Sequence, residues 1–297
     1  MAQPRRAPLP RSTPDEATVR FGCSSFSSDD WVGPFYPEGT QPRDYLRIYA
    51  QHFDTVEVDA TYYAVPRASI VDGWVDKTPE GFLLSAKFPK SICHAGEGPM
   101  PDGSKVLVPK ETFDERDRFL EVMSRMGDRL GPLVLQFPYF GKAVFSEPKI
   151  FLDRLDHFLD ELPAEFQYAV EVRNRTWVGP DLAHLLRRHR VTMVLVDQAW
   201  MPHGDEVEQS FDPITGPMVY VRLLGDRKEI ESITRTWDTE VIDRRERLER
   251  WATFLGRRVR QGQSTLVYVN NHYAGHAPTT VRRLQEMFEA EVQREAR

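Results

Sequence analysis

The chain has 297 residues, of which 40% are hydrophobic and 28% charged, as in an ordinary globular protein. A formal net charge of −6 excludes a basic footprint over the whole surface, although it leaves room for a local basic cleft. The two cysteines, Cys23 and Cys93, are too few for a disulfide framework or a structural zinc site, and they favour a cytoplasmic location. No run approaches the roughly 18 apolar residues of a membrane span, so we expect no membrane partner.

The start of the chain differs from the rest. Residues 1–17 contain four prolines and three arginines, and they lack the apolar run of a secretory signal. We expect residues 1–17 to be a disordered tail. Residues 18–297 show no break in composition, so we expect them to form one domain.

After the tail, short β-rich runs alternate with helical patterns. Eight runs are typical of strands: residues 18–24, 55–61, 82–88, 133–137, 168–173, 191–197, 218–224 and 266–271. After the sixth of them, residues 198–217 show no convincing helix. The alternation predicts parallel βαβ units, and eight units with a final helix favour a closed (β/α)8 TIM-type barrel. An open doubly wound sheet is the rival, but no GxGxxG or GxxxxGKS/T motif is present, and we expect no cofactor.

The stretch YAVEVR places two charged side chains on one face of an expected buried strand. Strand side chains alternate with period two, so Glu171 and Arg173 share a face. The other strands repeat the pattern, with valines in one phase, Val194 and Val196 included, which we expect to face the helices. Toward the C-terminal ends the opposite phase is polar: Ser24, Glu57, Asp59, Ser85, Lys87, Gln136, Glu171, Arg173, Asp197, Arg222 and Asn270.

In a barrel, the C-terminal ends of the strands converge on the face where active sites are built. We therefore predict that one pocket is surrounded by Glu57, Lys87, Glu171, Arg173 and Arg222. A purely structural network of ion pairs is the alternative, because opposite charges can also pair in the interior.

The spacing of Glu171 and Arg173 bears on their partners. Two residues along a strand span roughly 6.5–7 Å, which is too far for the simplest direct pairing. We expect an acidic neighbour to hold Arg173 while Glu171 faces the pocket, and Gln136 and Asp197 are the partners that the adjacent strands offer.

The candidate catalytic residues are Glu57, Lys87, Glu171 and Asp197. Glu57 and Glu171 have two open roles, as general acid and base or as partners that orient an arginine. Lys87 is either a nucleophile with a lowered pKa or an electrostatic anchor, and the anchor is favoured.

A second set of residues is expected to bind the ligand. Arginine suits bidentate recognition of a carboxylate or phosphate, amides donate to a ligand oxygen, and aromatic rings stack on a sugar or a base. His94 directly follows the third expected strand, where a ligand role competes with a capping role. The set comprises Tyr62, His94, Gln136, Arg173, Trp177, Arg222, Asn270 and Asn271.

The same residues do not indicate a metal site. A metal-dependent barrel hydrolase needs converging histidines and carboxylates, whereas these strands carry no histidine. The neighbouring lysine and arginines would also repel a cation.

Six motifs in chain order resemble the YecE-like family, also called domain of unknown function 72: VEVDATYYAVP, SAKFPKSICH, LVLQFPYF, YAVEVRNRTW, VYVRLLG and LVYVNNHYAGHAP. The resemblance covers nearly the whole chain after the tail and implies a TIM-type barrel, but it supplies no reaction. It also implies similarity to the barrels of endonuclease IV and xylose-isomerase-like proteins. The metal-binding histidines of those enzymes have no evident match here.

These observations lead to three hypotheses of function. The first is an enzyme that acts on a small anionic, hydroxyl-rich or nucleotide-like substrate by acid–base or hydrolytic chemistry. The second is a nucleic-acid-binding or endonuclease-IV-like barrel that acts at the same face, supported by a thin basic rim that includes Arg227 and Lys228. The third is a non-enzymatic ligand-binding scaffold. The sequence does not indicate the oligomeric state.

Overall fold

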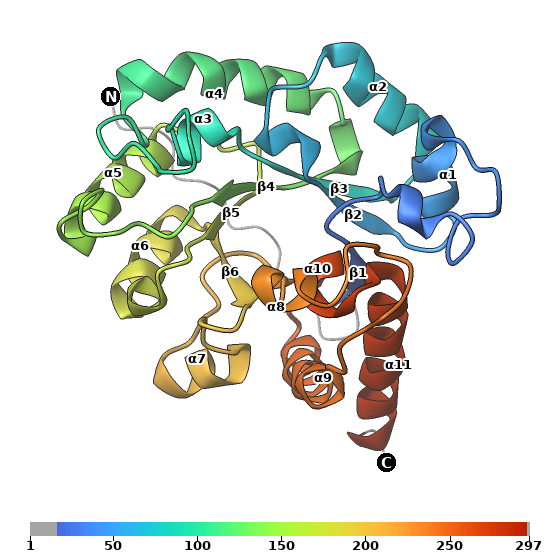
Figure 1. Cartoon of the computed structure of the whole chain (residues 1–297). Helices are drawn as coiled ribbons and strands as arrows, with labels where there is room; N and C mark the ends of the chain where they lie inside the picture. Colours follow the sequence, from blue (N-terminus) through green and yellow to red (C-terminus); the bar gives the residue numbers. More distant parts are fainter. Residues whose placement is uncertain (1–16, 296–297) are drawn as a thin grey trace.

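Eight parallel strands form the centre of the protein in a computed structural model that describes residues 17–295 (Figure 1). They pair in the order β1-β8-β7-β6-β5-β4-β3-β2. The predicted TIM-type barrel and all eight predicted strands are confirmed. The expected tail lies outside the described residues, apart from Ala17. The strands are β1 (Val19–Cys23), β2 (Thr55–Val58), β3 (Leu83–Lys87), β4 (Leu130–Gln136), β5 (Tyr168–Glu171), β6 (Thr192–Asp197), β7 (Val219–Leu223) and β8 (Thr265–Val269).

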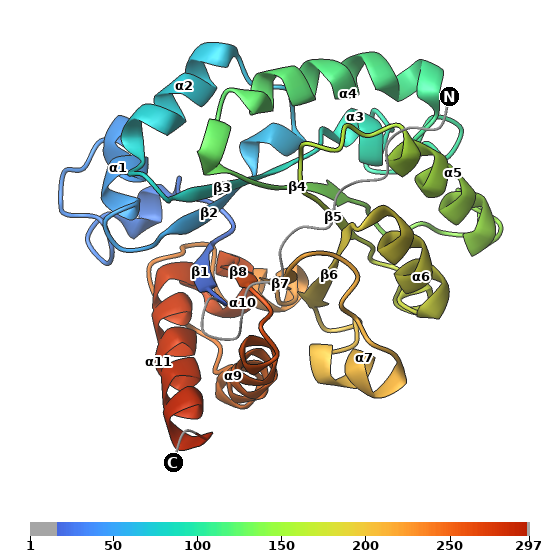
Figure 2. The same ribbon diagram turned by 180° about the vertical axis from the view of Figure 1, so that it is seen from behind.

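Helices cover the outside of the strands, as both views show (Figures 1 and 2). The outer helices are α1 (Tyr45–Tyr49), α2 (Ala68–Lys77), α4 (Pro109–Ser124), α5 (Pro148–Asp160), α6 (Pro180–His189), α7 (Gly204–Ser210), α9 (Arg245–Arg260) and α11 (Ala277–Glu295). Short helices after strands are α3 (Lys90–Cys93), α8 (Arg227–Glu231) and α10 (Asn271–Ala274). Single 3-10 turns span Asp29–Trp31, Pro42–Asp44, Ala60–Tyr62, Gly127–Arg129 and Arg175–Trp177. Among the described residues, no helix is long and apolar enough to cross a membrane.

Helix α7 follows β6, where the sequence predicts no convincing helix, so that expectation is wrong. The helix buries Val207 and carries Asp205 and Glu206 in its first turn, where carboxylates interact favourably with the helix dipole. Arg250 of α9 donates to Asp205 at 2.6 Å. Seven residues make about two turns, too few to show an apolar period, and the neighbouring helix supplies the missing stabilisation.

Two apolar cores lie on the two sides of the strands. The core between strands and helices contains Val56, Val170 and Met193, and the core inside the barrel contains Val134, Tyr220, Tyr268, Val194 and Val196. The prediction that the last two valines face the helices is therefore wrong. Met193 pairs with the helix-facing Val170, and this register turns the next residue of β6 inward.

The seam between β1 and β2 is closed by a side chain. No backbone ladder joins these two strands in the part of the chain that the structure describes. Instead, the buried hydroxyl of Tyr49 accepts from the Cys23 N–H at 2.7 Å and donates to the Thr55 carbonyl at 3.0 Å. Gly22 permits this close approach, because a Cβ there would lie 2.2 Å from the Thr55 carbonyl oxygen. Tyr49 thus satisfies one backbone donor and one backbone acceptor that would otherwise be buried and unpaired.

Replacing Tyr49 by phenylalanine tests the seam. Tyr49→Phe keeps the ring but leaves the Cys23 N–H and the Thr55 carbonyl without this partner, so we expect a loss of about 1–3 kcal/mol in the free energy of unfolding. Urea unfolding measures it. The control is Tyr63→Phe, because Tyr63 is 80% exposed, and we expect a change within about 0.5 kcal/mol. Equal effects of the two substitutions would contradict the role of the hydroxyl.

Candidate functional site

A pocket of about 720 Å³ opens at the C-terminal ends of seven strands. Its volume falls in the usual range for small-molecule sites, roughly 300–1,000 Å³. Every strand except β1 contributes a residue from its end or from the loop that follows. The lining residues are Asp59, Tyr62, Tyr63, Lys87, Gln136, Arg173, Gln198, Trp200, Arg222, Leu224, Gly225, Asp226, Arg227, Lys228, Asn270 and His272.

Beneath the pocket, Arg222 of β7 connects three other strands. Its guanidinium donates to Glu57 of β2 at 2.7 Å, to Gln136 of β4 at 2.9 Å and to Glu171 of β5. Both glutamates are 0% exposed and Arg222 is 1% exposed. Burial by itself lowers the pKa of Arg222, but the two carboxylates raise it above its ordinary value, so this guanidinium stays charged.

Glu57 is held in its ionised form by several donors. Tyr220 donates to it at 2.8 Å, and the Lys87 ammonium lies 3.1 Å away. Burial alone raises the pKa of Glu57, but Arg222 and Lys87 together bring it below the ordinary value. Tyr220 was not among the predicted site residues. Its position in β7 predicts a side chain in the core inside the barrel, and the sequence does not show that its hydroxyl bonds to a glutamate.

Glu171 and Arg173 pair directly, so the prediction that they are too far apart is wrong. Arg173 donates to Glu171 at 2.9 Å. The strand ends at Glu171, and the long side chain of Arg173 reaches back to it from the loop that follows. The expected orientations are also reversed, since Glu171 is buried and Arg173 lines the pocket. Burial raises the pKa of Glu171, but Arg222 and Arg173 lower it to about 2.

Asp59 differs from the two glutamates because it reaches the pocket. Its side chain is 34% exposed and pairs with Lys87, which is itself nearly buried. Burial at the pocket wall raises the pKa of Asp59, and this rise outweighs the lowering by Lys87, while the nearby Glu57 adds to it. Asp59 therefore holds a proton more readily than an ordinary aspartate does.

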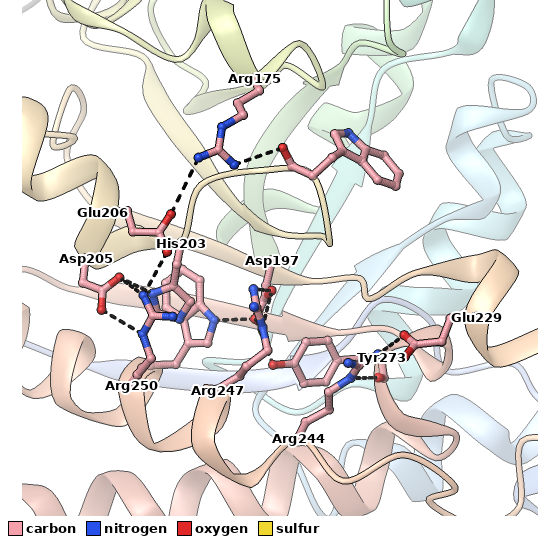
Figure 3. A network of polar contacts seen from close by, with 12 residues as sticks. Arg175, Asp197, His203, Asp205, Glu206, Glu229, Arg244, Arg247, Arg250 and Tyr273 are labelled. Atoms are coloured by element: carbon pink, nitrogen blue, oxygen red, sulfur yellow. Dashed lines mark hydrogen bonds and ion pairs between the residues drawn. The ribbon is translucent and has the colours of Figure 1, made fainter.

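The prediction that Asp197 belongs to this group is wrong. Figure 3 shows Asp197 with Arg247 and Tyr273, in a separate polar network. Its carboxylate accepts from Arg247 at 3.0 Å, from the Trp251 ring nitrogen at 2.7 Å and from Tyr273 at 2.9 Å. The same reversal of phase that turns Val194 inward turns Asp197 toward α9 and α10, where three donors make its burial tolerable.

Three predicted ligand-binding residues lie outside the pocket. Trp177 stacks on Phe151 with ring centres 4.9 Å apart, so it belongs to the helix-facing core. His94 bonds within its own loop, accepting from the Gly96 N–H at 3.1 Å. Asn271 accepts from the Trp31 ring nitrogen at 3.2 Å and caps the backbone near α11. Proximity to a strand end was the signal for all three, but it does not fix the direction of the side chain.

The other predicted residues come together, and sequence reasoning also missed some members of the pocket. Tyr62, Gln136, Arg173, Arg222 and Asn270 line it, as does Lys87. Gln198 and Asp226 were not predicted. Gln198 follows the last residue of β6 directly, so its place after a strand end was the available signal.

One group of potential metal ligands occurs in the described part of the chain, and it lies away from the pocket. Asp156, Asp160 and His189 come together between α5 and α6. The Asp156 carboxylate already accepts from Arg188 at 2.7 Å and contacts His189. This arrangement is that of a helix-to-helix ion pair.

The strands, helices and pocket define a single-domain (β/α)8 barrel with buried charges beneath its ligand-sized pocket. The chain belongs to the DUF72 family. The family model described as "Protein of unknown function DUF72" matches residues 20–297. The predicted YecE-like resemblance is thereby confirmed.

The relatives agree with this assignment. UPF0759 protein YecE of Escherichia coli (strain K12) is 32% identical over 174 residues, covering 56% of this chain and 58% of that protein. UPF0759 protein YunF of Bacillus subtilis (strain 168) is 28% identical over 162 residues, covering 54% of this chain and 53% of that protein. These matches span little more than half the length of each relative.

Two solved structures have a similar fold. A DUF72 family protein of Thermotoga maritima MSB8 has a TM-score of 0.66 and 26% identity, covering 92% of this chain and 99% of that one. One from Enterococcus faecalis V583 has a TM-score of 0.62 and 22% identity, covering 92% and 98%, and it supports the fold alone.

Replacing Glu171 tests whether the buried charges are structural. Glu171→Gln removes one of the two carboxylates on Arg222, and we expect a loss of about 3–5 kcal/mol in the free energy of unfolding. Chemical denaturation measures the loss. The control Glu165→Gln changes an exposed glutamate before β5, and we expect less than about 0.5 kcal/mol.

The pH dependence of stability gives an independent readout of the same carboxylate. The pKa of Glu171 is about 2 in the folded protein against 4.5 ordinarily, so its stabilisation is complete above pH 4.5 and is lost as the pH falls toward 2. We expect the wild type to lose stability through this window more steeply than Glu171→Gln. Parallel curves for the two proteins would contradict the assignment.

Proposed function

We propose that the protein is an enzyme that acts on a small anionic, hydroxyl-rich substrate by acid–base or hydrolytic chemistry. The proposed site is the pocket at the C-terminal ends of the strands. The observation that carries the proposal is Asp59, a carboxyl group with a raised pKa that reaches the pocket beside Lys87. A carboxyl whose pKa moves toward neutral is suited to give and take protons during catalysis.

Asp59 is the proposed general acid and base. In hydrolysis, a water molecule attacks the centre that loses the leaving oxygen, and protonated Asp59 gives its proton to that oxygen. The carboxylate that results, stabilised by Lys87, takes up the proton that the attacking water releases, which restores the starting form of Asp59. Lys87 also pairs with Glu57, which suits the anchoring role better than the role of a nucleophile. A group that must be protonated makes the rate fall as the pH rises through its raised pKa.

The charges of the pocket support an anionic substrate. Its lining contains five cations, Lys87, Arg173, Arg222, Arg227 and Lys228, against the two carboxylates of Asp59 and Asp226. The buried glutamates beneath offset two of these cations, and Glu231 pairs with Arg227, so the support for an anion comes from the exposed donors of Arg173 and Lys228 and not from a large net charge. Arg173 presents the planar guanidinium that suits a carboxylate or phosphate.

Glu57 and Glu171 have a different part in this proposal. Both are completely buried and bonded to several donors, so neither is placed to touch a substrate. They hold Arg222, Arg173 and Lys87 in fixed positions below the ligand. We therefore assign them positioning roles, in which they keep the cations of the pocket oriented before the substrate arrives.

A nucleic-acid role is the second candidate, and a specific feature favours it. The pocket wall includes the exposed rings of Tyr63 and Trp200, which are 80% and 44% exposed, next to Arg227 and Lys228. Exposed rings beside cations suit stacked bases and a phosphate backbone. Binding of a labelled single-stranded oligonucleotide that weakens steeply with salt would favour this candidate over a small substrate.

Replacing Asp59 tests the enzyme proposal. The probes are p-nitrophenyl phosphate, bis(p-nitrophenyl) phosphate and a set of p-nitrophenyl glycosides. With Asp59→Asn we expect kcat/KM to fall by roughly 100-fold or more while melting changes little, because the side chain is partly exposed. The matched control is Asp72→Asn on the outer helix α2, where activity should be unchanged.

The outcomes separate the candidates. Equal turnover by wild type and Asp59→Asn would contradict the assigned role. No turnover of any probe by the wild type would sink the hydrolytic proposal and favour a ligand-binding scaffold.

A further inference from the structure

Among the described residues that line the pocket, two have a buried polar atom for which residues 17–295 offer no hydrogen-bond partner. These atoms are Nε of Arg222 and Oε1 of Gln198, and both residues line the pocket. Arg222 is 1% exposed and Gln198 is 7% exposed. Buried polar groups in folded proteins are nearly always paired, because leaving one without a partner destabilises the folded state. Two such atoms at one wall indicate groups that a ligand satisfies.

The two atoms have opposite requirements. The Nε–H of arginine only donates, whereas the carbonyl oxygen of glutamine only accepts. The ligand must therefore present an acceptor to Arg222 and a donor to Gln198. The terminal nitrogens of Arg222 donate to Glu57, Gln136 and Glu171, whereas its Nε donates to no group in the part of the chain that the structure describes.

Arg173 indicates that the acceptor carries a charge. Its Nε is bonded to Glu171, and its side chain is 26% exposed at the pocket wall. Within residues 17–295, no group accepts from its two terminal nitrogens. Arg222 and Arg173 thus offer several donors from two guanidinium groups, an arrangement that favours a carboxylate or phosphate over a neutral oxygen.

The remaining walls suit a polyol skeleton. Tyr62, Tyr63 and Trp200 present aromatic rings, while Asn270 adds an amide. Rings of this kind pack against the apolar faces of sugars, and amides bond to hydroxyl groups.

We propose that the pocket binds an anion that bears a hydroxyl group, a hydroxy-carboxylate or a sugar phosphate, and that Gln198 is the residue that selects for the hydroxyl. The proposal rests on the proposed function in the same pocket, whose substrate class it narrows. The anionic group meets Arg222 and Arg173, and the hydroxyl donates to Oε1 of Gln198. An anion without a hydroxyl leaves that oxygen unpaired.

Matched pairs of small anions test this assignment by calorimetry on the full chain. The carboxylate pair is gluconate and hexanoate, the phosphate pair is glucose 6-phosphate and n-hexyl phosphate, both measured at pH 8, and glucose is the neutral probe. We expect the hydroxyl-bearing member of at least one pair to bind about tenfold or more tighter than its bare partner. The pair that shows this preference distinguishes a carboxylate from a phosphate. Glucose should bind more weakly than either hydroxyl-bearing anion.

Variants connect the preference to the two residues. Gln198→Leu should bring the ratio of the two dissociation constants within a pair close to one, without weakening the binding of the anion that lacks hydroxyl groups. Arg173→Met should weaken the binding of both members. Gln167→Leu, an exposed glutamine before β5, is the matched control and should leave the ratio unchanged. If Gln198→Leu fails to fold, Gln198→Asn serves instead, because it keeps the amide but draws it back by one methylene.

Each result has one reading. Equal binding within both pairs overturns the selection by Gln198 but leaves an anion-binding enzyme standing. Glucose binding as tightly as the anions overturns the charged part of the assignment. No binding of any probe overturns the inference as a whole, while turnover of the nitrophenyl probes decides the proposed function separately.

Discussion

The structure depends on a single guanidinium, Arg222, which forms ion pairs with two carboxylates inside the barrel. Removing Glu57 and Glu171 from water is tolerable only because this cation lies between them, with Tyr220 and Arg173 supplying further donors. These contacts link β7 to β2 and β5, which lie on different sides of the barrel. They hold the ends of these strands in place relative to one another, and these strand ends form the floor of the pocket. The pocket is therefore built on an ionic layer rather than on an apolar one.

This layer separates two kinds of charged residue. The carboxylate oxygens of Glu57 and Glu171 accept hydrogen bonds from donors within the protein, and both side chains are completely buried. Asp59 pairs with Lys87 but stands at the pocket wall, where its side chain is partly exposed. The surroundings of each carboxyl make the difference, since burial raises the pKa of all three acids and the neighbouring charges and donors decide the net direction.

The sequence predicts the barrel well because both of its signals are local. Alternating strands and helices are read along the chain, and the period of two correctly orients Glu57, Lys87, Gln136 and Arg222. It fails at β6, where MVLV is apolar on both faces and no side chain reveals which face is inward. The orientation there follows from the register with β5, a contact between distant residues that a single sequence does not contain. Asp197 was misplaced for that reason.

The limits of strand periodicity also explain why the pocket-lining residues beyond the strands were harder to orient than the buried ones. The framework residues Glu57, Glu171 and Arg222 lie within strands, where the period of two holds. Asp59, Arg173, Gln198 and Asn270 each lie one or two residues beyond a strand. Past that point the backbone turns into a loop, and side-chain direction depends on which partner it finds, as the bond from Arg173 back to Glu171 shows. The residues that hold the scaffold of this barrel can thus be recognised from periodicity. The direction of a side chain that lies beyond a strand end follows from the contacts it makes, which periodicity does not give.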